Sequence, residues 1–248
     1  MKACARSLLA LAALVSTTLA APTQSKNIDL HDVLASGLTI PEYIALIEGE
    51  SVEERDLTKR QYNGDTYNQL TDGTACRPIS VLYARGTNGA GNVGEAGSEG
   101  PSFFNAIAAR VGGISRLAIQ GVNYPATVLG FLAGGDAQGT TTLFNLINTT
   151  ASRCPSTKIV VSGYSQGAQL VHKALQRLTA AQAARVNAVV TFGDADRDTS
   201  FGLVNVANTL IICHEGDLIC ENTAILTPQH SNYEQDAPTA AAFVAARV

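Results

Sequence analysis

The 248-residue chain has little charge and no concentration of positive charge. Charged residues make up 15% of it, and 17 Lys and Arg stand against 21 Asp and Glu, a net charge of −4. Nucleic acid or an anionic membrane surface would call for a basic patch. We therefore expect neither as a partner. Internal repeats and low-complexity segments are also lacking.

Long apolar runs are absent. A membrane-spanning helix needs about 20 apolar residues, whereas the apolar run at residues 8–15 is much shorter. Lys2 and Arg6 precede this run, and the small-residue sequence Thr18-Leu19-Ala20 comes after it. The arrangement is typical of a secretory signal, and a signal anchor is the alternative. We expect residues 1–20 to be a signal peptide and the protein to be secreted.

Residues 21–60 differ in composition from residues 61–248. They are acidic and poor in large apolar residues near their end, and they close with Lys59-Arg60, a dibasic pair suited to an extracellular processing protease. We interpret them as a pro-segment, the alternative being a retained flexible arm. Residues 61–248 then form one domain, long enough to bury a large core.

The cysteines include no C-x-x-C pair. Once Cys4 is lost with the signal, four remain, an even number in a secreted chain: Cys76, Cys154, Cys213 and Cys220. Two disulfides are the natural interpretation, with three possible connectivities. A metal site is less favoured, because an oxidising compartment favours the disulfide.

Five short apolar runs have strand length and many β-branched residues. They are nearly continuous, as in a parallel sheet covered on both faces, and occupy residues 79–83, 117–122, 158–162, 188–192 and 209–213. Helix-like stretches lie at residues 101–111, 140–152, 166–178 and 238–248. This alternation predicts an α/β fold with its site at the carboxyl ends of the strands.

A G-x-S-x-G sequence comes directly after the third of these runs. In Gly163-Tyr164-Ser165-Gln166-Gly167, the serine lies between a predicted strand and a predicted helix. This is the nucleophile elbow of α/β-hydrolases. The glycines allow a sharp turn, and the Gln166 N–H would face an oxyanion at the positive end of the helix. Ser165 is the candidate nucleophile.

Only four histidines compete for the role of base. His31 lies in the predicted pro-segment, and His172 is two turns beyond Ser165 on the same helix. His214 ends a strand, and we interpret it as a structural or surface histidine. His230 lies after the last strand, where the base of such a fold belongs.

Asp217 is the candidate acid, because Ser165, Asp217 and His230 occur in the chain order of α/β-hydrolase triads. Cys213 and Cys220 could bracket it in a small loop that holds the carboxylate against His230. Its competitors are Asp194, Asp196 and Asp198. Their run, D-A-D-R-D-T-S, starts like a calcium loop but lacks the later glycine and glutamate, so we interpret it as a polar turn.

Thr87 lies just after the first predicted strand. The second oxyanion donor usually comes from such a loop, so the Thr87 N–H, or its hydroxyl, would join the N–H of Gln166. The alternative is that R-G-T-N-G is a simple turn.

From about Cys76 to the C-terminus, the chain resembles the fungal cutinases, which are secreted serine esterases. The resemblance rests on YARGTNGAGNVG, IQGVNYPA, CPSTKIVVSGYSQGAQL, FGDADR and CHEGDLICENTAILTPQH. It implies the disulfides Cys76–Cys154 and Cys213–Cys220. It also implies a small α/β-hydrolase with a five-stranded parallel sheet, helices on both faces, an exposed serine and no lid.

The predicted function is a carboxylic ester hydrolase with a Ser165–His230–Asp217 triad, and the resemblance implies cutin, other aliphatic polyesters and short- to medium-chain esters as substrates. Acetylxylan esterase is the nearest alternative, since threonine at position 87 also occurs there, but the apolar residues 224–226 suit an acyl chain. A lipase or a non-catalytic surface-binding protein is less favoured. No cofactor or metal is expected, and a monomer is our default.

Overall fold

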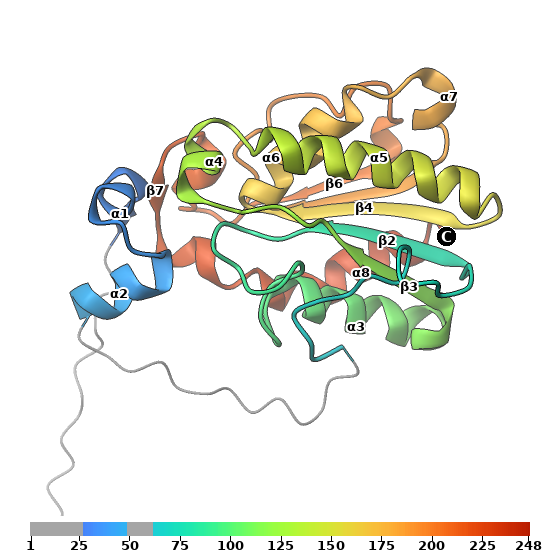
Figure 1. The fold of residues 1–248 in the computed structure, drawn as a ribbon, viewed down its shortest axis with the longest axis horizontal. Coiled ribbons are helices and arrows are strands. Elements are labelled where there is room, and N and C mark those ends of the chain that lie inside the picture. Colours follow the sequence, from blue (N-terminus) through green and yellow to red (C-terminus); the bar gives the residue numbers. More distant parts are fainter. Residues whose placement is uncertain (1–26, 49–61) are drawn as a thin grey trace, which may run out of the picture.

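The computed structural model describes residues 27–48 and 62–248. The predicted signal peptide and the Lys59-Arg60 pair lie outside the described residues. The centre of the molecule is a parallel sheet with the strand order β3-β2-β4-β5-β6 (Figure 1). Its strands are β2 (Ile79–Ala84), β3 (Leu117–Gly121), β4 (Lys158–Tyr164), β5 (Val186–Phe192) and β6 (Thr209–Ile212). The prediction of five parallel strands is confirmed.

Helices cover both faces of this sheet, as predicted (Figure 1). On one face lie α3 (Glu99–Val111) and α8 (Ala237–Ala245), and on the other lie α5 (Ala137–Arg153) and α6 (Gln166–Leu175). Alternate residues of β2 point to opposite faces: Val81 and Tyr83 pack with α3 and α8, while Leu82 and Ala84 pack with α5 and α6. Both faces are therefore apolar, which explains why the strand sequences do not alternate with polar residues.

Local signals fix the ends of the longer helices. The Asp136 side chain accepts a hydrogen bond from the Gly139 N–H and caps α5, and Gly112 ends α3 in the left-handed conformation. Two further short helices are α4 (Val128–Leu132) and α7 (Ala180–Ala183). The 3₁₀ turns are η1 (Ile114–Arg116), η2 (Val206–Asn208), η3 (Leu218–Glu221), η4 (Pro228–Ser231) and η5 (Tyr233–Asp236).

Residues 27–48, which the sequence assigns to a pro-segment, are folded against the domain. They form β1 (Ile28–Asp29), α1 (Leu30–Ser36) and α2 (Ile40–Glu48). Strand β1 pairs in antiparallel fashion with β7 (Ile225–Leu226). Leu30 and Val33 are buried in an apolar cluster that includes Phe131 of α4. Figure 1 shows this unit at the end of the molecule where α4 and β7 lie.

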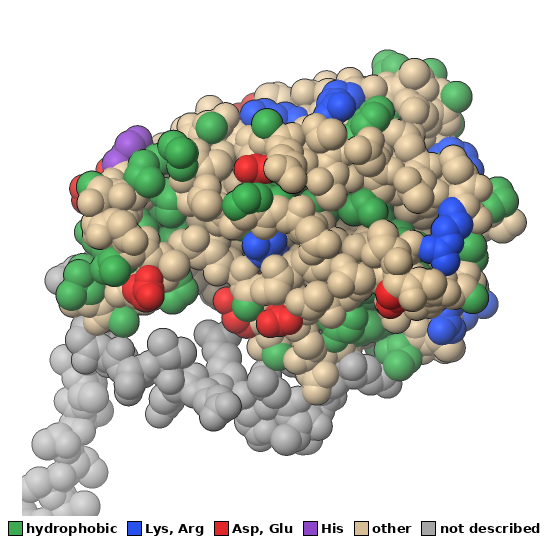
Figure 2. Space-filling view, in the orientation of Figure 1, with side chains coloured by type: hydrophobic (Ala, Val, Ile, Leu, Met, Phe, Trp, Pro, Cys, Tyr) green, Lys and Arg blue, Asp and Glu red, His purple; other side chains and the backbone are tan. Residues whose placement is uncertain are grey.

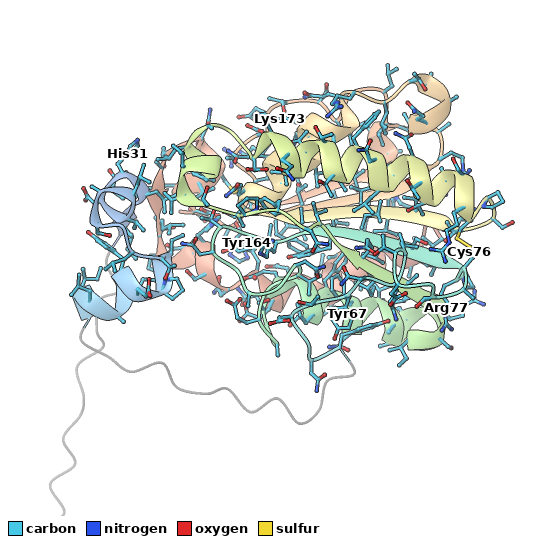
Figure 3. The ribbon with its side chains drawn as sticks, in the orientation of Figure 1. His31, Tyr67, Cys76, Arg77, Tyr164 and Lys173 are labelled. Carbon is cyan, nitrogen blue, oxygen red and sulfur yellow. A yellow bond between two sulfur atoms is a disulfide. The ribbon has the colours of Figure 1, made fainter. Side chains whose placement is uncertain are left out.

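Both disulfides implied by the resemblance are present. Cys76–Cys154 joins the segment before β2 to the end of α5, and Cys213–Cys220 closes the loop between β6 and η3. Figure 3 labels Cys76 at the end of the sheet far from α1. Among the described helices, none combines the length and apolarity that crossing a membrane would demand.

Candidate active site

Ser165 lies at a sharp turn between β4 and α6. Its backbone has φ of 54° and ψ of −120°, a region that non-glycine residues rarely occupy and that stores strain. The neighbouring Gly167 permits the turn, because a Cβ there would lie 2.0 Å from the Ala84 carbonyl oxygen. The predicted strand, serine and helix are therefore arranged as a nucleophile elbow.

The three predicted triad residues come together at the carboxyl edge of the sheet. The Ser165 Oγ lies 3.0 Å from His230 Nε2, and His230 Nδ1 lies 2.8 Å from Asp217 Oδ2. Asp217 caps the N-terminus of η3 and lies inside the Cys213–Cys220 loop, as predicted. Burial favours the neutral acid, but hydrogen bonds from His230, Tyr233 and the Ile219 N–H hold the pKa of Asp217 below its ordinary value.

Two neighbours fix the imidazole of His230. The Tyr164 hydroxyl donates to the His230 carbonyl oxygen at 2.6 Å, and the two rings stack with centroids 5.1 Å apart. Gly193, which comes directly after β5 with φ of 54°, lies against the ring of His230. A Cβ at Gly193 would lie 2.7 Å from His230 Cε1, so only glycine leaves room for the ring there.

Thr87 and Gln166 are joined directly. The Gln166 side chain donates from Nε2 to the Thr87 Oγ1 at 2.8 Å and to the Thr127 carbonyl oxygen at 2.9 Å. Since the Thr87 hydroxyl oxygen accepts this bond, its proton is available to another acceptor. Gln166 is also the first residue of α6, so its N–H has no acceptor within the helix. Thr87 lines the cavity beside Ser165, and the buried Gln166 directly follows Ser165 in the chain.

The N-terminal segment covers this site. The resemblance to the cutinases implies an exposed serine and no lid, but Ser165 is 5% exposed and His230 2% exposed. A cavity of about 190 Å³ lies against both, and residues 27–48 supply much of its wall: Ile28, Leu30, Ile40 and Ile44. The serine is covered because these side chains belong to an apolar cluster, and exposing that cluster to water would cost free energy.

A second cavity of about 480 Å³ adjoins the first and shares Ile40, Thr87, Tyr164 and Ser231 with it. Its wall includes three charged side chains, Arg85, Glu95 and Glu99. Figure 3 labels Tyr164, which contributes to both cavities. The site therefore has a smaller cavity, part of whose wall is the aliphatic surface of residues 27–48, and a larger cavity that carries charged side chains.

The family model for cutinases matches residues 75–248. The chain belongs to the cutinase family. Cutinase CUT2 of Pyricularia oryzae is 47% identical over 197 residues, which cover 77% of this chain and 90% of that protein. A cutinase of Blumeria hordei is 41% identical, over 74% of this chain and 76% of its own length. Cutinases are serine esterases, so the chain is an ester hydrolase.

Two solved structures agree with the fold. A Trichoderma reesei cutinase in complex with a phosphonate inhibitor matches with a TM-score of 0.68 and 36% identity, covering 86% of each chain. An acetylxylan esterase matches with a TM-score of 0.58 and 23% identity, over 70% of this chain and 99% of its own. At that identity the second match supports the α/β-hydrolase fold alone.

Within residues 62–248, two further histidine–carboxylate pairs accompany the predicted one. His172 Nε2 lies 2.8 Å from Asp194 Oδ2, deep in the domain, and His214 Nε2 lies 2.6 Å from Asp236 Oδ2. Sequence reasoning set both histidines aside as bases but did not find their partners, which are 22 residues away in each case. Across residues 27–48 and 62–248, no three His, Cys, Asp or Glu side chains are grouped as a metal site would need.

Proposed function

We propose that this cutinase-family chain is a secreted esterase that cleaves cutin, other aliphatic polyesters and short- to medium-chain esters. Ser165, His230 and Asp217 are its catalytic triad in this proposal. The observation that carries it is the unbroken series of hydrogen-bonding distances from the Ser165 Oγ through His230 to the Asp217 carboxylate. A serine on a strained turn, with a base on one side and a helix N-terminus on the other, is arranged for acyl transfer.

The reaction proceeds in two halves. His230 Nε2 takes the Ser165 proton as the Oγ attacks the ester carbonyl, and the imidazolium then protonates the leaving alcohol. An acyl-enzyme remains. Water, deprotonated by His230, attacks it and releases the acid. Asp217 accepts from Nδ1–H throughout, which orients the ring and stabilises its charged form.

Thr87 and Gln166 stabilise the oxyanion. In this proposal, the N–H of Gln166 and the N–H or hydroxyl of Thr87 donate to the ester oxygen on which the negative charge develops. The amide of Gln166 holds the Thr87 hydroxyl oxygen, so the hydroxyl proton is directed by a bond already made. Donors placed in advance cost no reorganisation during the reaction.

The shape of the site supports the substrate assignment. In the smaller cavity, the aliphatic side chains of residues 27–48 and of Leu226 form part of the wall, and such a surface suits an acyl chain. The larger cavity, whose wall includes charged side chains, would take the alcohol half of the ester. The named relatives are cutinases, which agrees with this assignment.

The arrangement of the chain remains part of the proposal. Residues 1–20 act as a secretory signal, residues 21–60 as a pro-segment and residues 61–248 as the catalytic domain. Two disulfides fit an extracellular protein. The enzyme works as a monomer without a cofactor or metal.

Organophosphate titration with a panel of esters tests the proposal. A stoichiometric adduct on Ser165 is expected, together with hydrolysis of p-nitrophenyl butyrate and release of hydroxy acids from cutin. Absence of the adduct would refute the serine mechanism. Deacetylation of xylan at a far higher rate than butyrate hydrolysis would instead refute the substrate assignment.

A further inference from the structure

His214 lies behind the proposed triad and contacts it in two places. It comes just after β6 and stacks on the buried ring of Tyr233, with centroids 3.9 Å apart and planes 12° apart. Its Nε2 lies 2.6 Å from Asp236 Oδ2, and its Nδ1 lies 2.8 Å from the Gln229 carbonyl oxygen. The side chains of His214 and Asp236 are 19% and 24% exposed, so the pair is only partly open to solvent.

Both ring nitrogens of His214 therefore face acceptors. A carbonyl oxygen can only accept a hydrogen bond, and so can an ionised carboxylate. A neutral imidazole has an N–H at only one ring nitrogen. At the other nitrogen, its lone pair would point at a lone pair of the acceptor oxygen, and the two would repel. Only the doubly protonated ring satisfies both. The geometry thus describes an imidazolium next to the Asp236 carboxylate.

The first link to the triad passes through Tyr233. The Tyr233 hydroxyl donates to Asp217 Oδ2 at 2.6 Å, and it accepts from the backbone N–H of His214 at 2.9 Å. A cation stacked on an aromatic ring is attracted to its face. The His214 imidazolium consequently holds the ring whose hydroxyl orients the catalytic acid.

The second link passes through the backbone next to the base. Gln229 immediately precedes His230, and its carbonyl oxygen is the acceptor of the His214 Nδ1–H. Tyr164 binds the carbonyl oxygen of His230 itself. The turn that carries the base is therefore held by two side chains, and His214 is one of them.

The charged groups around His214 favour its protonated form. Asp236 of η5 is in direct contact, Asp217 lies beyond the Tyr233 hydroxyl, and Glu215 is an exposed neighbour in sequence. Partial burial opposes the charge, but hydrogen bonds to Gln229 and Asp236 outweigh it and raise the pKa of His214 above 6.5. Because the pKa is raised, the charged His214 stabilises the folded protein fully at pH below about 6.5. This stabilisation is lost as the pH rises through the raised pKa.

We propose that His214 and Asp236 form a charged positioning pair that holds Tyr233 and the Gln229–His230 turn against Asp217, and that its neutralisation limits activity at alkaline pH. This inference rests on the proposed triad. His214 touches neither the substrate nor the reacting atoms. It acts through Tyr233 and Gln229, so its loss should lower kcat more than it changes KM.

Histidine NMR on the full chain tests the charge directly. With only four histidines in the chain, a His214→Phe variant identifies the His214 signal by its disappearance. In the unsubstituted protein this signal should titrate above pH 6.5, the ordinary value. In Asp236→Asn the midpoint should fall by about one unit or more, because the neutral amide no longer stabilises the imidazolium. A midpoint at or below the ordinary value in the unsubstituted protein would overturn the proposal whether or not Asp236→Asn folded.

Kinetics then test the link to catalysis. The kcat for p-nitrophenyl butyrate is measured across neutral and alkaline pH and normalised to the number of sites titrated by an organophosphate. In Asp236→Asn the alkaline fall in kcat should move to lower pH, in step with the His214 midpoint. His214→Phe keeps a flat ring on Tyr233 but loses the charge and the bond to Gln229, and its kcat should fall about tenfold or more, since small displacements of catalytic groups are costly.

Asp198→Asn is the matched control, because Asp198 is 94% exposed and its removal takes away the same charge from the surface. Its pH profile should match that of the unsubstituted protein. Superimposable normalised profiles for Asp236→Asn and the unsubstituted protein would refute the positioning role while leaving the triad intact. Failure of Ser165 to react with the organophosphate would refute the proposed function itself.

Discussion

Ile28 pairs with Leu226 in the short β1–β7 ladder, so a segment near the start of the chain is bonded to the stretch that leads into His230. The same segment forms part of the wall of the smaller cavity beside Ser165. Figure 2 shows hydrophobic side chains gathered on the surface over α1 and α2, and Leu34 and Leu46 are exposed there. Access to the serine therefore depends on how firmly residues 27–48 are attached.

Loosening this segment should speed access to the serine. Leu30 is 1% exposed in the cluster beneath α1, and truncation of a buried leucine costs about 2 to 5 kcal/mol. Leu30→Ala should therefore open the site and raise the rate of organophosphate inactivation severalfold. Leu34→Ala, on the same helix but 42% exposed, is the control. Equal inactivation rates in both variants would contradict a covering role.

Thr87 tests the oxyanion site. Thr87→Val keeps the shape but removes the hydroxyl that Gln166 holds, and loss of one such donor lowers kcat by about 10²–10³. Thr87→Ser keeps the hydroxyl and should retain most of the activity. Steady-state kinetics with p-nitrophenyl butyrate distinguish the two. If the valine variant were as active as the serine variant, the backbone N–H groups alone would account for the oxyanion site.

Gly193 tests the space around the base. In Gly193→Ala the new Cβ would lie 2.7 Å from His230 Cε1, so the imidazole must move away from Ser165, and kcat should fall by about 10² or more. Gly73→Ala is the control, since Gly73 also has positive φ but open space around it. It should lose about 1–2 kcal/mol of stability from backbone strain alone and retain its kcat. If Gly193→Ala and Gly73→Ala lost comparable activity, backbone strain and not contact with His230 would explain the loss.

Tyr233→Phe removes a hydrogen bond from the Asp217 carboxylate. That bond lowers the pKa of Asp217. It therefore stabilises the folded protein at pH values above the ordinary pKa of an aspartate. This stabilisation is lost as the pH falls through the lowered pKa. The variant should unfold at a higher pH during acid titration and lose about 1.5–3 kcal/mol at neutral pH. Circular dichroism gives both measurements.

Tyr62→Phe offers the comparison, because the Tyr62 hydroxyl makes only a 3.5 Å contact with the Ile114 carbonyl oxygen. Its acid transition should stay close to that of the unsubstituted protein. The role assigned to Tyr233 would be untenable if both phenylalanine variants unfolded at the same pH.

The parts of this structure that sequence could predict are those with a local signature. Continuous apolar runs identified the five strands, and a serine between glycines at a strand–helix junction identified the elbow. The chain order of Ser165, Asp217 and His230 singled out three residues that the structure does bring within hydrogen-bonding distance. Each of these signals depends on residues close in sequence or on the order imposed by the fold.

The parts that could not be predicted depend on pairing between distant residues. Strand β1 has only two residues, and it gains its partner β7 from the far end of the chain, so no periodicity indicates it. The charged end of residues 21–60 also dominates their composition, so the sequence did not indicate that apolar positions such as Leu30 and Val33 pack against the domain. Likewise, nothing in the spacing of His214 and Asp236 distinguishes them from a surface histidine and a surface acid.

Part of the wall of the smaller cavity lies far in sequence from the proposed catalytic groups. Ile28, Ile40 and Ile44 precede the first strand of the five-stranded sheet, whereas the triad comes from the second half of the domain. Substitutions in residues 27–48 can thus change the acyl preference without altering the triad. Relatives could diversify by exchanging this segment, and a directed-evolution library confined to these three positions would vary specificity while leaving the catalytic domain unchanged.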